Sequence, residues 1–240
     1  FNGFDNAEAM RIDSLGNVGI GATSPTAPTD IRGANSAVHG RGQLYLSNTE
    51  TAAVNAGSQI SFGATYSGTT QSFVASVAGR KENSTSGDYA GYLQFSTRPN
   101  GGNNTERMRI DSSGNLLVST TSIAVAQGTG TGVSIRDMGR VEASADGNTS
   151  AIFNRVTSDG NIVNFAKDGS TVGSISSTDN SGIIIGSHDV GLRFRQQSAG
   201  AAVFPREPDG SALDATLDLG ISNSRFKDLY LSGDTFVGEP

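Results

Sequence analysis

One fourteen-residue segment occurs twice, and it constrains the fold more than any other feature. Residues 106–119 read ERMRIDSSGNLLVS, and residues 8–21, located 98 positions earlier, read EAMRIDSLGNVGIG. In each copy apolar residues alternate with arginine, an Asp-x-x-Gly-Asn turn follows, and a second apolar run resumes. The Asp accepts backbone N–H groups, and the Gly takes the positive φ that closes a type I turn with a bulge. Each copy therefore predicts a β-hairpin.

Much of the remaining chain reads as short strands with period-2 alternation, separated by turns rich in glycine, asparagine and serine. The predicted strands are Gln43–Leu46, Gln59–Phe62, Ser72–Val77, Gly91–Ser96, Val133–Arg136, Ala151–Val156, Asn161–Ala166 and Thr171–Ser176. Asp-Gly pairs favour hairpin turns, and they occur at 146–147, 159–160 and 168–169. The run Ile183–Ile185 predicts a strand buried on both faces.

Only the end of the chain changes period. Phe226, Leu229 and Tyr230 have helical spacing, and the residues at 222–224 are possible caps. This pattern predicts at most one short helical turn near 223–230, followed by an extended segment over 231–237. The expected fold class is all-β, built of hairpins and small antiparallel sheets.

The composition predicts a thin core. Leu, Ile, Val and Phe together supply 52 of 240 residues, just above the level of about 20% below which chains read as disordered. The apolar runs are short and evenly spread, and isolated hairpins are marginal in water. We therefore expect an obligate homo-oligomer in which strands from several copies wrap one axis and cover one another's edges. The alternative is a large single-chain sandwich.

Charge and residue usage exclude several classes of protein. The net charge is −6 and the basic residues do not cluster, so nucleic acid is not an expected partner. There is no cysteine, and no apolar run approaches the roughly 18–20 residues of a membrane span, so no membrane insertion is expected. Residue 1 is Phe, and we expect the chain to be a fragment of a longer protein.

The sequence offers no arrangement typical of catalysis. His39 and His188 are the only histidines and stand alone, although one His per chain on a three-fold axis would present three imidazoles to a metal. The glycines at 128–132 precede a strand pattern rather than the helix that a dinucleotide loop needs. The acids of the distal half read as turn or solvated residues: Asp137, Glu142, Asp146, Glu207, Asp209 and Asp214. We expect no enzyme, no cofactor and no metal.

Aromatic side chains are the better candidates for binding. Tyrosine rings stack on sugar rings, and exposed loops on a rigid scaffold are where binding usually occurs. The loops over 63–70 and 79–91 bring such residues, and the candidates for contact with a surface glycan are Tyr45, Tyr66, Tyr89 and Tyr92. Packing in a core or an interface is the alternative role for each.

The repeated segment resembles a repeat of bacteriophage tail fibre and tail-associated proteins, in which a form like RMRIDSSGNVGIGT recurs. Residues 10–21 fit that form well, whereas the second copy departs from it at Leu117 and Ser119. Residues 155–174 and 218–233 resemble stretches that precede the distal end of such proteins, often just before an endosialidase-type intramolecular chaperone. No catalytic residue is carried over from that chaperone.

The resemblance implies a homotrimeric β-rich fibre in the virion, arranged around a three-fold axis. Its partners would be other phage tail or baseplate proteins and a host surface glycan or outer-membrane receptor. The expected trimer-core residues are Met10, Ile12, Met108, Ile110, Leu116, Ile162 and Ile184. The expected modules are 1–29, 30–120, 121–205 and 206–240.

Two other functions are the alternatives to a tail fibre. A tailspike polysaccharide depolymerase would show β-helix coils with a sustained period of roughly 20–30 residues, which the sequence lacks. A cellular trimeric adhesin would usually show heptad stalks or a C-terminal set of membrane strands, and neither is visible. The expected function is therefore a structural and adhesive component of a tail fibre.

Overall fold

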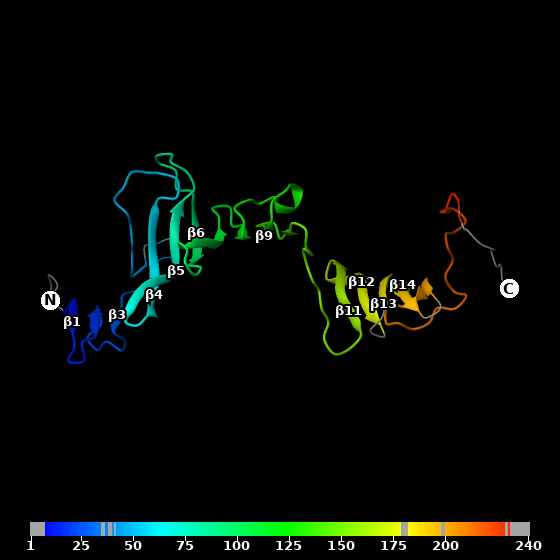
Figure 1. The fold of residues 1–240 in the computed structure, drawn as a ribbon, viewed down its shortest axis with the longest axis horizontal. Helices are drawn as coiled ribbons and strands as arrows, with labels where there is room; N and C mark the ends of the chain where they lie inside the picture. Colours follow the sequence, from blue (N-terminus) through cyan, green and yellow to red (C-terminus); the bar gives the residue numbers. More distant parts are fainter. Residues whose placement is uncertain are drawn as a thin grey trace. The chain divides into compact units, whose positions relative to one another are not determined.

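The computed structural model describes residues 8–34, 37, 40, 42–178, 182–197, 200–228 and 230, without the side chain of Gln197. The chain divides into two compact units, Phe1–Ser150 and Ala151–Pro240, here called unit 1 and unit 2 (Figure 1). Within the described residues the secondary structure is fifteen β-strands and one 3-10 turn, Val125–Gln127. The all-β prediction is confirmed.

The first sheet is small and contains the first hairpin. Strands β1 (Met10–Ile12) and β2 (Val18–Ile20) pair antiparallel, and β3 (Thr29–Ile31) pairs with β2 in parallel. Asp13 Oδ1 accepts hydrogen bonds from two backbone N–H groups, those of Leu15 at 2.8 Å and Asn17 at 2.9 Å. Because Gly16 has a φ of 85°, the turn needs glycine there, as the sequence predicts.

The second sheet is a seven-stranded antiparallel meander in the order β10-β9-β8-β7-β6-β5-β4. Its strands are β4 (Gly57–Ser67), β5 (Thr70–Lys81), β6 (Gly91–Thr97), β7 (Thr105–Ile110), β8 (Leu116–Val118), β9 (Gly132–Ile135) and β10 (Val141–Ser144). The second copy of the repeat forms the β7–β8 hairpin, and its Gly114 has a φ of 86°. In this copy, unlike the first, strands flank the hairpin on both sides.

The third sheet forms unit 2 and is a five-stranded antiparallel meander. Its strands are β11 (Gly160–Lys167), β12 (Ser170–Thr178), β13 (Gly182–Ser187), β14 (Val190–Gln197) and β15 (Gly200–Arg206). The predicted turn between β11 and β12 is present, and both Asp168 and Gly169 have the positive φ that a tight hairpin turn requires.

The core is thin. Among the described residues the buried apolar side chains are Ala22, Ala78, Tyr92, Leu117, Val125 and Ile184, and the buried polar residues outnumber them. The accessible surface is 18005 Å². A compact globular protein of 24.6 kDa would expose about 10,000 Å². The chain therefore leaves far more surface in water than a self-sufficient domain does.

The predicted helical turn is absent from the described residues near 223–230. Ile221 and Ser224 instead form an isolated antiparallel bridge, with two backbone hydrogen bonds of 3.0 Å. Three residues at helical spacing cannot offset the cost of nucleating a helix without packing against other elements. Leu229 and the predicted extended segment at 231–237 lie outside the described residues.

Two predicted strands and two predicted turns are also wrong. Residues 43–46 and 151–156 are not strands, although their sequence patterns favour extended pairing. The Asp-Gly pairs at 146–147 and 159–160 do not close hairpins, and the second of these leads directly into β11. In each case the segment has no partner strand to pair with in its own chain. An extended segment becomes a strand only when it pairs with another.

The predicted module boundaries fall within strands or sheets. Residue 29 begins β3, and residue 205 lies inside β15. The boundary at 120 separates β8 from β9, which are hydrogen-bonded neighbours in one sheet. The observed division at 150–151 was not predicted, because Asn-, Ser- and Gly-rich connectors occur throughout the chain.

Candidate functional site

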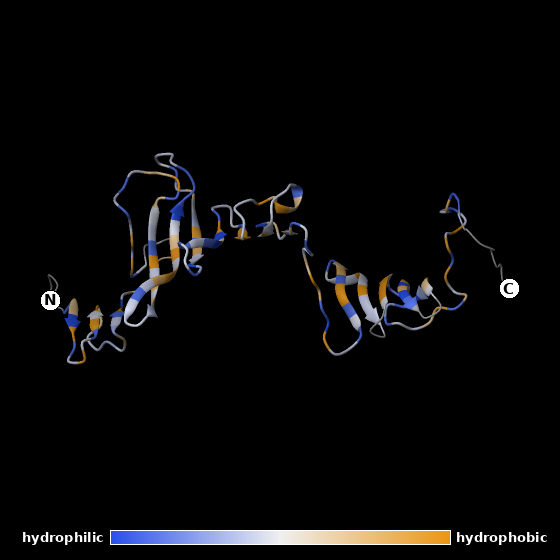
Figure 2. Ribbon diagram, viewed as in Figure 1, coloured by the Kyte–Doolittle hydropathy of each residue, from blue (hydrophilic) through white to orange (hydrophobic). Residues whose placement is uncertain are grey.

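The large sheet of unit 1 has one face made of apolar side chains. Cross-strand partners point to the same side of a sheet, so the register defines the face. Ile110, for example, pairs with Leu93 on β6 and Leu116 on β8. The face, called the unit 1 apolar face, comprises Ile60, Phe62, Val77, Leu93, Phe95, Met108, Ile110, Leu116, Val118, Val133, Ile135 and Val141. All of these residues are exposed or half-buried, and Figure 2 shows hydrophobic bands on these strands.

Unit 2 repeats this arrangement. Ile175 on β12 pairs with Val163 and Ile185, and the register continues across β14 and β15. The unit 2 apolar face comprises Val163, Phe165, Ile175, Ile183, Ile185, Leu192, Phe194, Val203 and Pro205. None of these side chains is charged and none is buried. A continuous apolar surface across five strands therefore faces solvent in the single chain.

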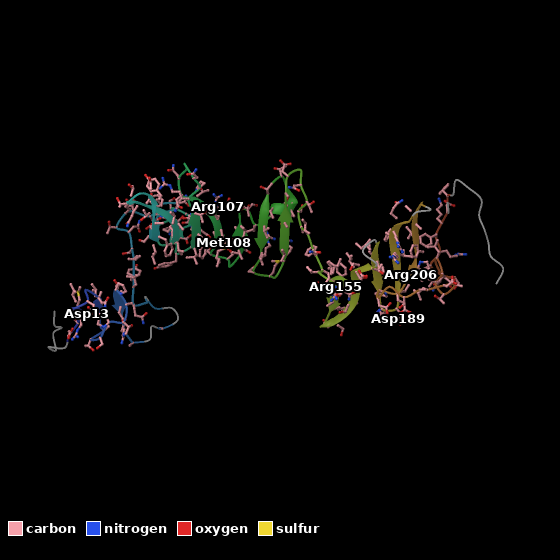
Figure 3. All side chains as sticks on the ribbon, turned by 60° about the horizontal axis from the view of Figure 1, so that its bottom comes forward. Asp13, Arg107, Met108, Arg155, Asp189 and Arg206 are labelled. Atoms are coloured by element: carbon pink, nitrogen blue, oxygen red, sulfur yellow. The ribbon has the colours of Figure 1, made fainter. Side chains whose placement is uncertain are left out.

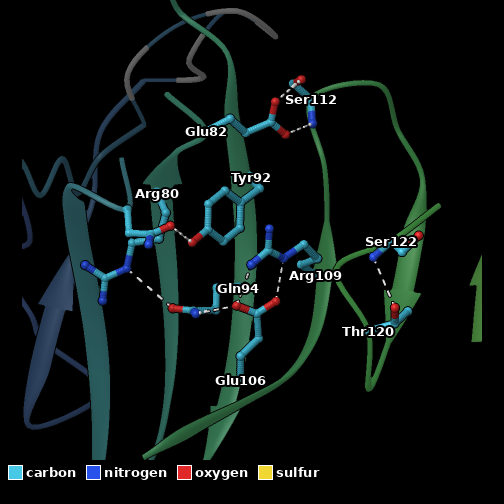
Figure 4. A network of polar contacts seen from close by, with 10 residues as sticks. Arg80, Glu82, Tyr92, Gln94, Glu106, Arg109, Ser112, Thr120 and Ser122 are labelled. Atoms are coloured by element: carbon cyan, nitrogen blue, oxygen red, sulfur yellow. Dashed lines mark hydrogen bonds and ion pairs between the residues drawn. The ribbon is translucent and has the colours of Figure 1, made fainter. Parts of the chain in front are cut away.

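The opposite face of the unit 1 sheet carries a network of polar side chains (Figure 4). Glu106 accepts hydrogen bonds from Gln94 Nε2 at 2.7 Å and from Arg109 Nη2 at 2.8 Å. The Arg109 guanidinium carbon lies 4.0 Å from the centre of the Tyr92 ring. Burial of Glu106 by itself raises the pKa of its carboxyl, but the hydrogen bonds from Arg109 and Gln94 outweigh that effect and lower the pKa.

The opposite face of the unit 2 sheet is covered by the segment after β15. Ser176 Oγ donates to the carbonyl oxygen of Pro208 at 2.9 Å, so this segment lies across the sheet. Arg193 is buried there, with Nη2 donating to the Thr178 carbonyl at 3.3 Å and the guanidinium 5.6 Å from the Phe204 ring. The covered side of this sheet is thus rich in serine and arginine.

Each larger sheet therefore leaves its more apolar face exposed, while its other face combines buried polar side chains with a few buried apolar ones, such as Leu117 and Ile184. Monomeric soluble proteins rarely expose contiguous apolar patches larger than a few hundred Å². Larger patches mark surfaces that bind another protein or a membrane. The two apolar faces are the candidate functional surfaces of the chain.

The first hairpin follows the same rule on a smaller scale. Met10 pairs with Ile20, and Ile12 pairs with Val18, so these side chains share one side of the small sheet. Ile12 is 68% exposed. Arg11 forms an ion pair with Glu8, as Arg109 does with Glu106 in the second copy.

Five predicted trimer-core residues, Met10, Ile12, Met108, Ile110 and Leu116, lie on these apolar faces; Met108 is labelled in Figure 3. Their contact with another chain stays a prediction.

The other two predicted trimer-core residues differ. Ile162 lies at the register shift between Asn161 and Val163 in β11 and is half-buried. Ile184 must be corrected, because it is 0% exposed within its own chain. Its neighbours Ile183 and Ile185 point to the opposite side and are exposed, so the run is not buried on both faces as predicted.

Tyr92 also needs correction as a glycan-contacting residue. It is 5% exposed, its hydroxyl donates to Asn55 Oδ1 at 2.7 Å, and Arg109 covers its ring. Burial raises the pKa of the Tyr92 hydroxyl. Tyr92 therefore holds the loop before β4 against the sheet, and it contributes only a small exposed part to the cavity that Tyr45 and Tyr89 line.

Tyr45 and Tyr89 line one cavity of about 560 Å³, and Tyr89 is 99% exposed. Leu93 of the unit 1 apolar face lines the same cavity and a neighbouring one of about 280 Å³. Tyr66 lies elsewhere, in a cavity of about 450 Å³ with Phe73 and Arg98. The structure thus divides the three exposed candidate tyrosines between two places.

The described residues contain no group of three His, Asp or Glu side chains that could hold a metal ion. His188 lies in the turn between β13 and β14 with a φ of 51°, and its Nδ1 is 3.1 Å from Ser187 Oγ. His39 lies outside the described residues. Of the six acids considered from the sequence, Glu142 is buried, where it pairs with Arg140 at 2.6 Å.

No known protein family matches the chain, and no curated protein shows significant sequence similarity to it. Within the described part of the chain, no helix has the length and apolar character needed to cross a membrane.

Several residues of the apolar faces were missed by the sequence analysis. The most prominent are the aromatic residues Phe62, Phe95, Phe165 and Phe194. Their period-2 alternation within strands was visible in the sequence and could have identified them.

Proposed function

We propose that this chain is a structural and adhesive component of a bacteriophage tail fibre, and that it works as a homotrimer. The observation that carries the proposal is the exposed apolar face on each large sheet. Such faces need a permanent cover in water, because leaving apolar surface exposed costs about 25 cal/mol per Å². A structural protein that exists only as an assembly satisfies that need.

Copies of the same chain are the best cover for these faces. The chain carries a net charge of −6, so identical copies repel one another unless the contact surfaces lack charge. The side chains of both apolar faces are uncharged, and Arg80, Arg109 and Arg193 lie on the opposite faces. A closed ring of copies also protects strand edges, such as β4 and β10, from open-ended pairing.

The number of copies and the virion setting rest on the repeated segment and its likeness to tail fibre sequences. In that setting other phage tail or baseplate proteins would hold the fibre, and a host surface glycan or outer-membrane receptor would be its target. The loops that bear Tyr66 and Tyr89 are the surfaces proposed for attachment.

Labelled virions test this function. A phage that encodes this chain is incubated with gold-conjugated antibodies raised against residues 1–240 and imaged by electron microscopy. The proposal predicts label on the tail fibres, and antibody fragments should reduce adsorption to host cells. Particles that carry no label, with the protein found only in infected cells, would contradict a virion role.

A further inference from the structure

The cavity beside Tyr66 lies apart from the unit 1 apolar face. Its walls come from the β4–β5 turn region and the loop after β6, and they comprise Tyr66, Thr70–Val74 and Arg98–Gly101. None of the residues that define the unit 1 apolar face lines this cavity, whereas Leu93 lines both cavities near Tyr45. The Tyr66 cavity therefore shares no residue with the surface that other copies are proposed to cover, whereas the cavity at Tyr89 adjoins that surface.

Arg98 is held in a fixed position at this cavity. Its Nε donates to the Gly102 carbonyl at 2.8 Å, and its Nη1 donates to Ser72 Oγ at 2.6 Å. The guanidinium carbon lies 5.0 Å from the centre of the Phe73 ring. Three contacts thus orient the guanidinium before any ligand arrives, which reduces the entropy lost on binding.

The charge of Arg98 is not neutralised locally. Across the described part of the chain no carboxylate lies within ion-pair distance of it, and its Nη2 makes no hydrogen bond. By contrast, Arg11, Arg32, Arg109 and Arg140 each have an acidic partner. An oriented guanidinium with a free N–H group is suited to a carboxylate, which it binds through charge-assisted hydrogen bonds.

The other walls suit a sugar ring. Tyr66 and Phe73 are exposed aromatic side chains, and aromatic rings offer faces to the C–H groups of a sugar. Gln71 and Asn100 place amide groups beside them, which can bond to hydroxyls. The register shift between Thr65 and Ser67 leaves Tyr66 outside the regular pairing, and bulges commonly re-aim side chains in this way.

We propose that this cavity binds a sugar that carries a carboxylate, with the carboxylate on Arg98 and the ring against Tyr66 and Phe73. The inference rests on the proposed adhesive function and names the class of ligand for it. Neutral sugars fit the aromatic walls but leave the Arg98 charge without a partner. The cavity should therefore bind a sugar with a carboxylate more tightly than a neutral sugar.

Calorimetric or NMR titration of the assembled protein tests the preference with two probes that differ only in the acidic group, methyl glucuronide and methyl glucoside. The glucuronide should bind about threefold to tenfold more tightly at low salt, and 0.5 M NaCl should remove most of that difference. Equal affinity for the two probes, or no binding of either, would overturn the proposal.

Two arginine variants test whether Arg98 causes the tighter binding of the glucuronide. Arg98→Gln should abolish the preference for the glucuronide while keeping weak binding of both sugars. Arg107→Gln is the matched control, because Arg107 on β7 donates to Thr97 Oγ1 at 3.1 Å and does not line this cavity (Figure 3). Tyr66→Ala should weaken both sugars. A preference that survives Arg98→Gln would show that the carboxylate binds elsewhere.

Failure of the ligand assignment can be distinguished from failure of the proposed function. Antibody labelling of virions and the mass of the protein do not depend on sugar binding. A labelled, trimeric fibre with no preference for the glucuronide would remove only the ligand assignment. A chain that binds the glucuronide through Arg98 but is absent from virions would keep the site and remove the virion role.

Discussion

At the scale of single residues, the repeated turn is the best-determined feature. Asp111 Oδ1 accepts from the backbone N–H groups of Ser113 at 3.0 Å and Asn115 at 2.8 Å, and Oδ2 accepts from the Asn115 side chain at 2.8 Å. Asn115 is buried and its Oδ1 accepts from the Asp137 backbone at 3.2 Å. Asn115, which Asp111 holds in place, thus joins the β7–β8 turn to the turn after β9. The sequence predicted the role of Asp111 in its own turn and could not predict this link.

Replacement of Asp111 by alanine should lower stability. It removes three hydrogen bonds to a carboxylate and leaves the buried Asn115 amide without its partner, which should cost about 1–3 kcal/mol. The measurement is thermal unfolding at one fixed protein concentration, since oligomer stability depends on concentration. Ser113→Ala in the same turn is the control and should change little. An unchanged midpoint for Asp111→Ala would mean that glycine and register alone define the turn.

Glu106 should make stability depend on pH. Its pKa is lowered in the folded chain, so its contribution is present above the unfolded pKa of about 4.3 and is lost as the pH falls through the folded value. The wild type should therefore lose stability below about pH 4.5, and Glu106→Gln should be less stable at pH 7 but lose less on acidification.

Urea unfolding at pH 7 and pH 3.5 measures that dependence. Glu50→Gln is the control, because Glu50 is exposed and makes no hydrogen bond within the described residues. If Glu106→Gln loses as much stability on acidification as the wild type, other groups determine the pH dependence.

At the scale of elements, the alternation of apolar and polar residues predicted most strands correctly, and the Asp-Gly pair at 168–169 predicted one turn correctly. The alternation could not predict which face of a strand the chain itself covers. Ile183 and Ile185 are exposed on one side of the sheet. Ile184 is buried on the other side, which the segment after β15 crosses. That crossing joins residues 32 positions apart and leaves no local signal.

The sequence indicated Tyr66 and the loop over 63–70 as binding candidates. It could not place Phe73 and Arg98 beside them, because these residues meet Tyr66 only in the folded sheet.

The neighbours Ile184 and Ile185 provide a matched pair of substitutions in one strand. Ile184→Asp places a charge inside unit 2 and should abolish its fold, because an unpaired buried charge costs several kcal/mol. Ile185→Asp changes a side chain that is 51% exposed, so the sheet should still form in concentrated samples, but the assembly should dissociate and unfold on dilution at a higher protein concentration than the wild type does. Circular dichroism reports the fold and sedimentation reports the assembly. Identical behaviour of the two variants would contradict the division into a covered and an open face.

The two mispredicted strands fit the same explanation at this scale. Residues 151–156 include Ile152, Phe153 and Val156, all exposed, and residues 43–46 include the exposed Leu44 and Leu46. Both segments have the composition of strands without a pairing partner in their own chain. The sequence pattern shows only that a segment favours an extended backbone. Whether it forms a hydrogen-bonded strand depends on a partner strand.

At the scale of the whole molecule, exposed surface dominates the energetics. The chain leaves roughly 8,000 Å² more surface in water than a compact protein of its mass. Stable interfaces between obligate partners commonly bury 2,000–5,000 Å² in total. The thin core and the two apolar faces describe one property, namely that few apolar side chains are buried within the chain itself. This property supports the proposal that copies of the chain cover one another.

Sedimentation equilibrium of the purified chain tests this central claim most directly. We expect a single species with three times the 24.6-kDa chain mass, whose circular dichroism spectrum keeps its β-sheet signal at micromolar concentration. Dilution should not release folded monomers, because the apolar faces would then meet water. A folded, soluble monomer at micromolar concentration would contradict the claim that copies of the chain cover these faces.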